Sequence, residues 1–315
     1  DSEDVIHTSF NPAQGRTGRF SSSNPNLQNL KRPDDNDKLD PVDVRASFIP
    51  RPGFVFVMLD YSQLEYRVML DQAEARELID QVKSGLDVHE ATAKLAGVTR
   101  QQAKTANFLN LFGGGVKLLA ENLGTTEEKA RQIKQAIFKA APEMKDFIRE
   151  VISKAEKRGW IFNWLGRRYQ FPDKTKCYKA PNYLIQGGCA DLVKLVMNKI
   201  SDLLRDTKSH MILTIHDELV FEIHESEFHL IPQIKEIMET TYPYKRLPLT
   251  TSVEYSYENL SKTVAGFPPG TPMVKSTHGA EKSRDSFQGA DQTAFSFTPL
   301  HVVCEDTAGN TTRNP

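Results

Sequence analysis

Three acidic residues stand where apolar stretches of the sequence end or break. Asp60 follows the run FVFVML, and Asp217 and Glu218 interrupt the run MILTIHDELVFEI. A carboxylate beside a buried strand is costly unless it is solvated, paired or bound to a metal, so these residues are candidate metal ligands. Oxygen ligands with only one histidine nearby, His216, favour Mg²⁺ over zinc. Taken singly, each acid is also compatible with an ordinary turn residue or helix cap.

Two aspartates that converge from neighbouring strands suggest a particular chemistry. A pair of Mg²⁺ ions about 4 Å apart supports in-line phosphoryl transfer, with one ion at the attacking oxygen and the other at the leaving group. Nucleases, phosphatases and polymerases share this arrangement. Asp60 and Asp217 therefore indicate a reaction family and leave the reaction open.

A helical segment, RQQAKTANFLNLFGG, narrows the choice. Arg100, Lys104 and Phe108 are spaced by four residues, so they lie along one helical face at intervals of roughly 6 Å. Two cations followed by an aromatic ring suit a triphosphate with its base stacked further along. The alternative is a solvated cationic face on a helix whose aromatic residues belong to the core. Together with the carboxylates, the segment describes a nucleotidyl transferase.

The elements that must position these residues can be read from apolar periodicity and from helix-capping signals at Asp87, at Thr99 with Gln102, and at Thr125 or Thr126. We expect strands at 54–59 (ending at Asp60), 211–223 (in two halves) and 250–257. Residues 62–82 and 87–158 should be mostly helical, with further helices at about 181–204 and 226–241 and a short hairpin at 159–168. Residues 1–50 read as loop, and residues 268–315 as a flexible or weakly folded tail. The order predicts an α+β fold in which a sheet carries an all-helical insertion.

Composition sets further bounds. The 315 residues are 39% hydrophobic and 26% charged, which is typical of a globular protein. No apolar run approaches the roughly 20 residues that cross a bilayer, and no secretory signal is visible, so we expect no membrane association. Three well-separated cysteines argue against a zinc site or a disulfide framework. The net charge of −1 hides a basic segment, 100–208, with 21 Lys and Arg against 11 Asp and Glu. That segment could hold a polyanion or could be a solvated surface.

Five stretches of the sequence resemble DNA polymerases of family A, the bacterial DNA polymerase I type that phages also carry. DYSQLEYR, RQQAKTANFLNLFGG and HDEL are similar to polymerase motifs A, B and C. TGRFSSSNPNLQNL and NYLIQGGCADLVKL are similar to two further stretches of that family, and all five occur in its order. The resemblance covers residues 5 to about 267.

The resemblance implies a palm subdomain with an antiparallel catalytic sheet, interrupted by helical fingers. The corresponding boundaries are 1–67 for the first part of the palm, 68–180 for the fingers, 181–267 for the second part of the palm and 268–315 for the tail.

The resemblance also implies roles for individual residues. The two Mg²⁺ ions would be bound by Asp60, Asp217 and the peptide carbonyl of Tyr61, with Glu218 as an accessory acid. Glu65 corresponds to a steric gate against the ribose 2′-hydroxyl. The residues that would bind the incoming nucleotide are Tyr61, Glu65, His89, Arg100, Lys104, Phe108 and Phe112. Lys104 would also act as an acid toward pyrophosphate. The residues that would contact primer–template DNA are Arg19, Arg67, Asn182, Gln186 and His216.

Two positions depart from the family pattern: Phe112 stands where a tyrosine is usual, and Leu109 where a glycine is common. The first stretch that resembles the family begins at Thr17, close to the start of the sequence, so the thumb and the exonuclease of the family would lie upstream. We therefore expect a fragment or a split subunit that lacks both domains, with weak DNA retention unless a separate chain supplies the thumb.

The functional prediction is template-directed DNA synthesis from dNTPs, in replication or repair, in the cytoplasm of a bacterium or a phage-infected host. A non-catalytic DNA-binding or assembly subunit is the alternative, although such a role would not require Asp60, Asp217 and Lys104. An RNA-synthesising or reverse-transcribing relative is a third possibility, and Glu65 argues against the use of NTPs.

Overall fold

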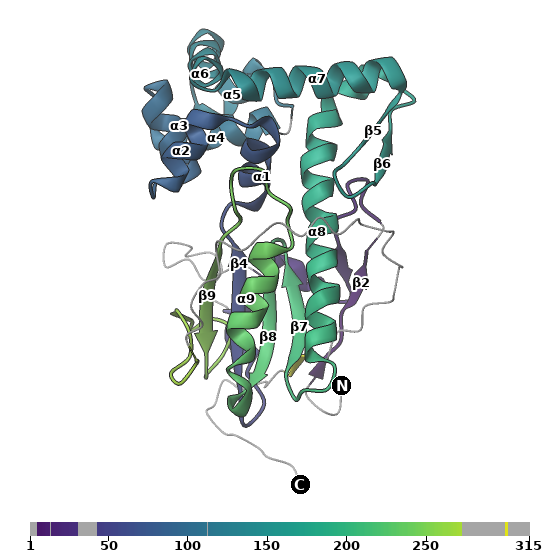
Figure 1. Ribbon diagram of the computed structural model, residues 1–315, viewed down its shortest axis with the longest axis vertical. Helices are drawn as coiled ribbons and strands as arrows, with labels where there is room; N and C mark the ends of the chain where they lie inside the picture. The colour runs from purple at the N-terminus through teal and green to yellow at the C-terminus, as the bar shows by residue number, and fades with distance from the viewer. Residues whose placement is uncertain (1–4, 13, 31–42, 112, 273–299, 302–315) are drawn as a thin grey trace.

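The computed structural model describes residues 5–12, 14–30, 43–111, 113–272 and 300–301. Figure 1 shows two halves, a sheet covered by helices below and a group of helices above. The long helix α8 (Ala180–Leu204) runs from one half to the other. Its 25 residues correspond to a length of about 37 Å, enough to carry side chains of both halves on one rigid element.

The lower half is built on a five-stranded sheet of order β10-β9-β4-β8-β7, with every neighbouring pair antiparallel. Its strands are β4 (Phe54–Tyr61), β7 (His210–Ile215), β8 (Glu218–His224), β9 (Thr251–Ser256) and β10 (Val264–Ala265). The predicted class, α+β with an antiparallel sheet, is confirmed.

The central strand β4 is apolar along its length because both of its faces are covered. Val55, Val57 and Leu59 point into the main core with α8 and α9 (Leu230–Thr240). Phe56 and Met58 point to the other face, where a smaller core includes residues from the N-terminal region. Alternation of side chains along a strand sends successive residues to opposite faces, so a continuous apolar run fits a strand buried on both sides.

β4 does not end at Asp60, as the sequence suggested, but continues through Tyr61. Asp60 pairs with Glu218 on one side and Ser252 on the other, and Tyr61 pairs with Thr251. The Tyr61 hydroxyl also donates to the carbonyl oxygen of Met238 at 2.7 Å. These long-range partners extend the strand beyond the point where its apolar character stops.

Between β4 and α8 lie the helices of the upper half: α1 (Leu64–Ala73), α2 (Arg76–Lys83), α3 (Val88–Ala96), α4 (Arg100–Leu111), α5 (Val116–Leu123), α6 (Glu127–Ala140) and α7 (Pro142–Arg158). The expected capping residues are in place. Asp87 accepts from the first turn of α3, Thr99 and Gln102 form a reciprocal capping box, and Thr126 caps α6. Residues 62–82 are mostly helical, as expected, and are divided into α1 and α2 because Glu74 adopts a left-handed conformation between them.

The hairpin of β5 (Trp160–Phe162) and β6 (Arg168–Gln170) packs directly against α8, and two glycines permit the contact. A Cβ on Gly187 would lie 1.8 Å from the Tyr169 hydroxyl, and one on Gly188 would lie 2.2 Å from the Trp164 ring. No larger side chain fits at either position.

The N-terminal region is less irregular than expected. It contains β1 (Val5–Ile6), β2 (Ser9–Asn11) and β3 (Ser21–Ser23), and short 3-10 helices at Leu27–Asn29 and Val44–Ser47. Strand β11 (Leu300–His301) pairs with β1, so part of the predicted tail has regular structure. Most of 268–315 lies outside the described residues. Further 3-10 turns occupy Lys174–Lys179 and Glu225–Glu227, and the second delays the start of α9 to residue 230.

None of the helices in the described part of the chain combines the length and apolar character that crossing a membrane requires.

Candidate active site

The predicted metal ligands meet where β4 lies beside the turn between β7 and β8. Asp60 is directly opposite Glu218 in the ladder, and the Tyr61 amide donates to the carbonyl oxygen of Asp217 at 3.3 Å. Residues 157 positions apart in sequence, Asp60 and Asp217, are therefore brought together by the pairing of two strands. The sequence predicted this convergence only on the condition that the strands were neighbours.

His216 and Asp217 form the two-residue turn of the β7–β8 hairpin. His216 has a φ of 56°, a left-handed conformation that histidine, like asparagine and aspartate, adopts more readily than other residues with a side chain. The tight turn leaves His216 exposed and Asp217 half-buried. Burial raises the pKa of Asp217, opposed by the positive charges of Arg19 and His216. A carboxylate destabilised in this way is well suited to a cationic ligand.

These residues line a cavity of about 850 Å³, together with polar residues of the N-terminal region. Its charged and polar lining includes Gln28, Asn29, Arg45, Asp60, Tyr61, His216, Asp217, Glu218 and Glu254. Among the described residues there is no cluster of three or more His, Cys, Asp or Glu side chains arranged to hold a metal. Two carboxylates without a complete protein cage nevertheless fit Mg²⁺, which commonly takes one or two carboxylates, waters and substrate phosphates.

A second group lies beside Asp217 and contains the predicted gate. Glu65, in the first turn of α1, forms an ion pair with Arg19, and its side chain is 8% exposed. Burial raises the pKa of Glu65; the positive charge of Arg19 opposes this effect, the negative charge of Asp217 adds to it, and a hydrogen bond from Gln186 lowers the pKa. The Glu65 carboxylate is thus held between two predicted DNA contacts and one predicted metal ligand.

Arg19 owes its place to anchors on α8. The Lys194 ammonium donates to the carbonyl oxygens of Pro12 and Gly18, at 2.7 and 2.5 Å. Gly18 has a φ of 81° and packs against the guanidinium of Arg167. The chain just before Arg19 is therefore fixed to the same helix that carries Gln186.

The predicted nucleotide-binding face of α4 is solvent-accessible. Arg100, Lys104 and Phe108 are all exposed, with 37% of Phe108 accessible. Arg100 forms an ion pair with Asp87, the cap of α3, through an Nε–Oδ2 contact of 2.9 Å. The helix thus presents two cations and a ring on one face, as the spacing predicted.

His89 lies beneath that face and is only 2% exposed. Its ring stands 5.5 Å from the ring of Phe108 and 5.7 Å from that of Tyr66, and its Nδ1 is 3.2 Å from Nδ2 of Asn107. Burial lowers the pKa of His89 to about 4; Asp87 raises it, and the cations of α4 lower it further. At neutral pH the imidazole is uncharged.

The remaining predicted contacts are spread around the site. Asn182 lies one turn before Gln186 on α8, and its buried Oδ1 accepts no hydrogen bond from the described residues. Arg67 donates from Nη1 to the carbonyl oxygen of Pro248 at 3.3 Å. Phe112 lies outside the described residues. The individual roles assigned to these side chains stay predictions.

The comparisons with known proteins agree with this geometry. Residues 1–260 match the description DNA polymerase family A. The chain belongs to that family.

Several relatives make the family A membership concrete. The chain is 33% identical to the thermostable DNA polymerase I of Thermus aquaticus, covering 81% of this chain and 32% of that protein. It is 34% identical to the DNA polymerase of Mycobacterium phage L5, covering 72% of this chain and 36% of that protein. The chain therefore spans about a third of the length of the curated relatives it matches.

A solved structure extends the likeness to three dimensions. The POL domain of Pol1 from M. smegmatis, in complex with DNA primer-template and dNTP, superposes with a TM-score of 0.75 at 30% identity. The match covers 81% of this chain and 48% of that one. The architecture of this family A chain is thus that of part of a polymerase domain.

The family A site also contains residues that the sequence reasoning missed. A cavity of about 240 Å³ next to Asp217 is lined by Cys189 of α8 and by Asn26, Gln28 and Asn29. The three amides belong to the stretch TGRFSSSNPNLQNL, from which only Arg19 was selected. The clustering of these three amides in a segment of small polar residues could have indicated a polar site in the sequence. No sequence feature pointed to Cys189, because its position depends on how α8 packs.

Proposed function

We propose that this chain carries out template-directed DNA synthesis, transferring a nucleotide from a dNTP to a primer 3′-hydroxyl with release of pyrophosphate. The observation that carries the proposal is the convergence of Asp60 and Asp217 next to the Arg19–Glu65–Gln186 group. Membership of family A and the likeness to a polymerase domain bound to primer-template and dNTP support it.

Asp60, Asp217 and the Tyr61 carbonyl would hold two Mg²⁺ ions, with Glu218 as an accessory acid opposite Asp60. Such ions supply acidification of the primer hydroxyl and neutralisation of charge on the phosphates. The protein's part would be to keep these acidic residues close together: Asp60 lies opposite Glu218 in the strand ladder, and the Tyr61 amide donates to the carbonyl oxygen of Asp217.

The exposed face of α4 would bind the incoming nucleotide. Arg100 and Lys104 offer positive charge to the triphosphate, and Lys104 is the proposed proton donor to pyrophosphate. Phe108 would lie under the sugar and base. His89, uncharged and beneath Phe108, would support the Phe108 ring. As a contact to the nucleotide phosphates it would offer a hydrogen bond rather than a positive charge.

Glu65 would exclude NTPs. Its carboxylate is buried and fixed by Arg19 and Gln186, so it cannot easily move aside for a 2′-hydroxyl. Arg19, Gln186 and His216 would contact the primer–template, and Asn182 would lie beside the template base, where its unsatisfied Oδ1 could accept a hydrogen bond. Arg67 would support the DNA-binding side of the site from α1.

We further propose that the chain acts with a separate chain or segment that supplies a thumb or exonuclease, and that it works in the cytoplasm of a bacterial cell or a phage-infected host. The 68–180 region would serve as fingers that close on the palm, and the palm would comprise 1–67 and 181–267.

The test is primer extension on a DNA template with Mg²⁺ and dNTPs. Extension that stops on addition of EDTA and resumes with Mg²⁺ is the expected result. A chain that binds primer–template but never extends it would instead be a DNA-binding or assembly subunit.

The gate assignment has its own test, in which Glu65→Ala is compared with the unmodified chain. Removing the carboxylate should raise NTP incorporation relative to dNTP by roughly ten- to a hundredfold, as loss of a steric and polar exclusion does. Unchanged discrimination would assign sugar selection to another residue.

A further inference from the structure

A buried carboxylate outside the metal site, Asp71, has an unusual number of hydrogen bonds. It is 0% exposed and lies in the last turn of α1. Its Oδ1 accepts from the amides of Arg246 and Leu247 at 2.6 and 2.8 Å, and its Oδ2 accepts from the Lys245 amide at 2.9 Å and the Tyr242 hydroxyl at 3.0 Å. Asp71 therefore captures a run of three consecutive backbone amides.

Nothing in the helix itself favours a carboxylate there. The C-terminal end of a helix carries a partial negative charge, so an acidic side chain in the last turn is locally unfavourable. Burying that charge adds a desolvation cost unless donors replace the lost water. The four donors all come from residues 242–247, more than 170 positions along the chain. The placement of Asp71 is thus explained by the segment that it binds.

That segment, 241–250, joins α9 to β9 and also contacts the start of α1. The Ser62 amide donates to the carbonyl oxygen of Thr250 at 2.9 Å, and Arg67 reaches the carbonyl oxygen of Pro248. The segment then enters β9, where Thr251 pairs with Tyr61. One length of chain therefore holds α1 at both ends and continues into the strand next to Asp60.

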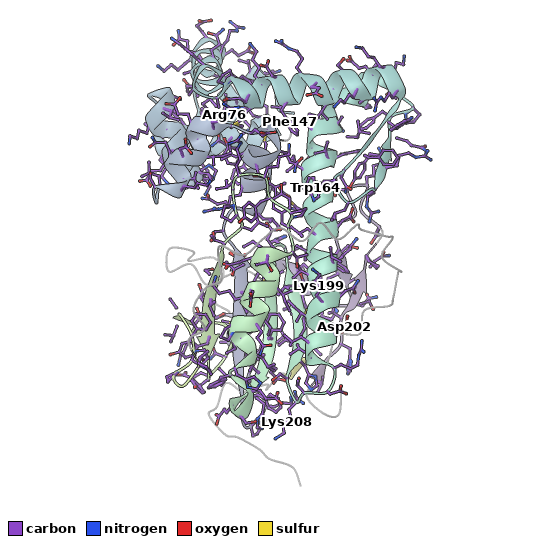
Figure 2. All side chains as sticks on the ribbon, in the orientation of Figure 1. Arg76, Phe147, Trp164, Lys199, Asp202 and Lys208 are labelled. Carbon is purple, nitrogen blue, oxygen red and sulfur yellow. The ribbon has the colours of Figure 1, made fainter. Side chains whose placement is uncertain are left out.

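A second contact ties the same segment to α8. The Tyr242 hydroxyl, bound to Asp71, also accepts from Nε2 of Gln72, and the Tyr242 ring meets Trp164 edge-on at 5.8 Å between centroids. Figure 2 shows Trp164 beside α8, at the level where the helical half meets the sheet. Trp164 occupies the space above Gly188, two residues beyond Gln186.

We propose that Asp71 is a positioning residue that sets where Glu65 stands relative to Asp60 and Asp217, and through it the selection of deoxyribose. The inference rests on the proposed function. α1 carries Glu65 near its start and Asp71 at its end, so anchoring the end to 242–247 fixes the direction of the helix. The bonds at Ser62 and Arg67 then fix its first turn against the strand that bears the metal ligands.

The chain offers a matched control in Glu74, which follows α1. Glu74 also binds the segment, through exposed ion pairs with the side chains of Lys245 and Arg246 at 3.2 and 3.4 Å. Exposed pairs of this kind contribute little. Substitution of Asp71 therefore removes a buried contact to Lys245 and Arg246, and substitution of Glu74 removes an exposed contact to the same two residues.

The first test is hydrogen exchange of the backbone amides in Asp71→Ala, Asp71→Asn and Glu74→Ala. Asp71→Ala should accelerate exchange in 242–250 and also in 60–67, by roughly tenfold or more, while the β7–β8 hairpin keeps its protection. Asp71→Asn keeps one acceptor oxygen for Arg246 and Leu247, so it should show a smaller change, and Glu74→Ala none. Faster exchange confined to 242–250 would overturn the proposal.

The second test is the ratio of dNTP to NTP incorporation. A misplacement of about 1 Å can cost on the order of a hundredfold, so Asp71→Ala should lower the ratio by about tenfold, with partial rescue in Asp71→Asn. A variant that only lost stability would leave the ratio unchanged below its melting temperature, and that result would contradict the proposal. If Asp71→Ala does not fold, Asp71→Asn decides both tests. If the unmodified chain incorporates no nucleotide, polymerisation fails as the function, and hydrogen exchange still decides the structural coupling.

Discussion

The strand-tip cluster around Asp60 and Asp217 and the α4 face with Arg100 and Lys104 differ in how firmly they are held. Asp60 stands on β4, which is paired on both sides, and the half-buried Asp217 stands in the tight turn between β7 and β8, where its carbonyl oxygen accepts from the Tyr61 amide. The cations stand on an exposed helix face, with Arg100 in an ion pair whose side chains are 50% and 31% accessible. The anionic part of the site is therefore built into the sheet and its tight turn, whereas the cationic part consists of solvent-exposed side chains on a helix face.

The difference has an energetic consequence. Charge held in a partly buried site acts at a lower effective dielectric constant than charge on a solvated surface. Each carboxylate should therefore contribute more to the reaction than each cation, and the effect of the cations should be the more sensitive to salt. The following predictions test this ranking, from the largest expected effect to the smallest.

The largest effect is expected for Asp60→Asn and Asp217→Asn. Each substitution removes one of two anionic ligands while preserving size, and single-nucleotide incorporation should fall by about a thousandfold or more. Asp202→Asn is the control, because Asp202 forms an exposed pair with Arg205 at the far end of α8 (Figure 2). Near-normal incorporation by either active-site variant would remove that residue from the metal site.

A smaller effect is expected for Lys104→Ala. Loss of one exposed cation that stabilises the triphosphate should lower kcat/KM for dNTP by about a hundredfold, and raising the salt concentration should narrow the difference. Lys94→Ala provides the comparison, since Lys94 is exposed on α3 and donates to Gln81. If Lys104→Ala costs as much as Asp217→Asn, the two regions contribute equally and the ranking is wrong.

The smallest effect concerns the stability of the helical half at low pH. The pKa of His89 is about 4 in the fold against an ordinary value of 6.5, so below pH 6.5 the unfolded chain binds a proton that the folded chain does not. Stability from this group is complete above pH 6.5 and declines as the pH falls toward 4, by about 2 kcal/mol. Urea unfolding at pH 7 and pH 4.5 measures the free energy of unfolding lost on acidification. This loss should be smaller in His89→Gln than in the unmodified chain, by about 2 kcal/mol. Equal sensitivity in both proteins would mean that His89 is not kept neutral by burial.

Local patterns predicted most of the elements. A continuous apolar run identified β4, and Asp87, Thr99 and the pair Thr125 and Thr126 marked the starts of three helices, because capping depends on neighbours two or three residues away. The predicted end of the first strand was wrong because a distant partner decides it: β4 runs on through Tyr61 because β9 pairs with it there.

The same division applies to the site. The sequence by itself determined the chemistry available: carboxylates at strand ends, cations and an aromatic ring on one helix face, and motifs specific enough to name the family. Only the tertiary structure decided which of these groups share an environment. The pairing of Arg19 with Glu65, the neutral His89 and the burial of Asp71 each depend on residues far away in sequence. The physical reason is that desolvation and long-range hydrogen bonds arise from packing, which composition and spacing do not specify.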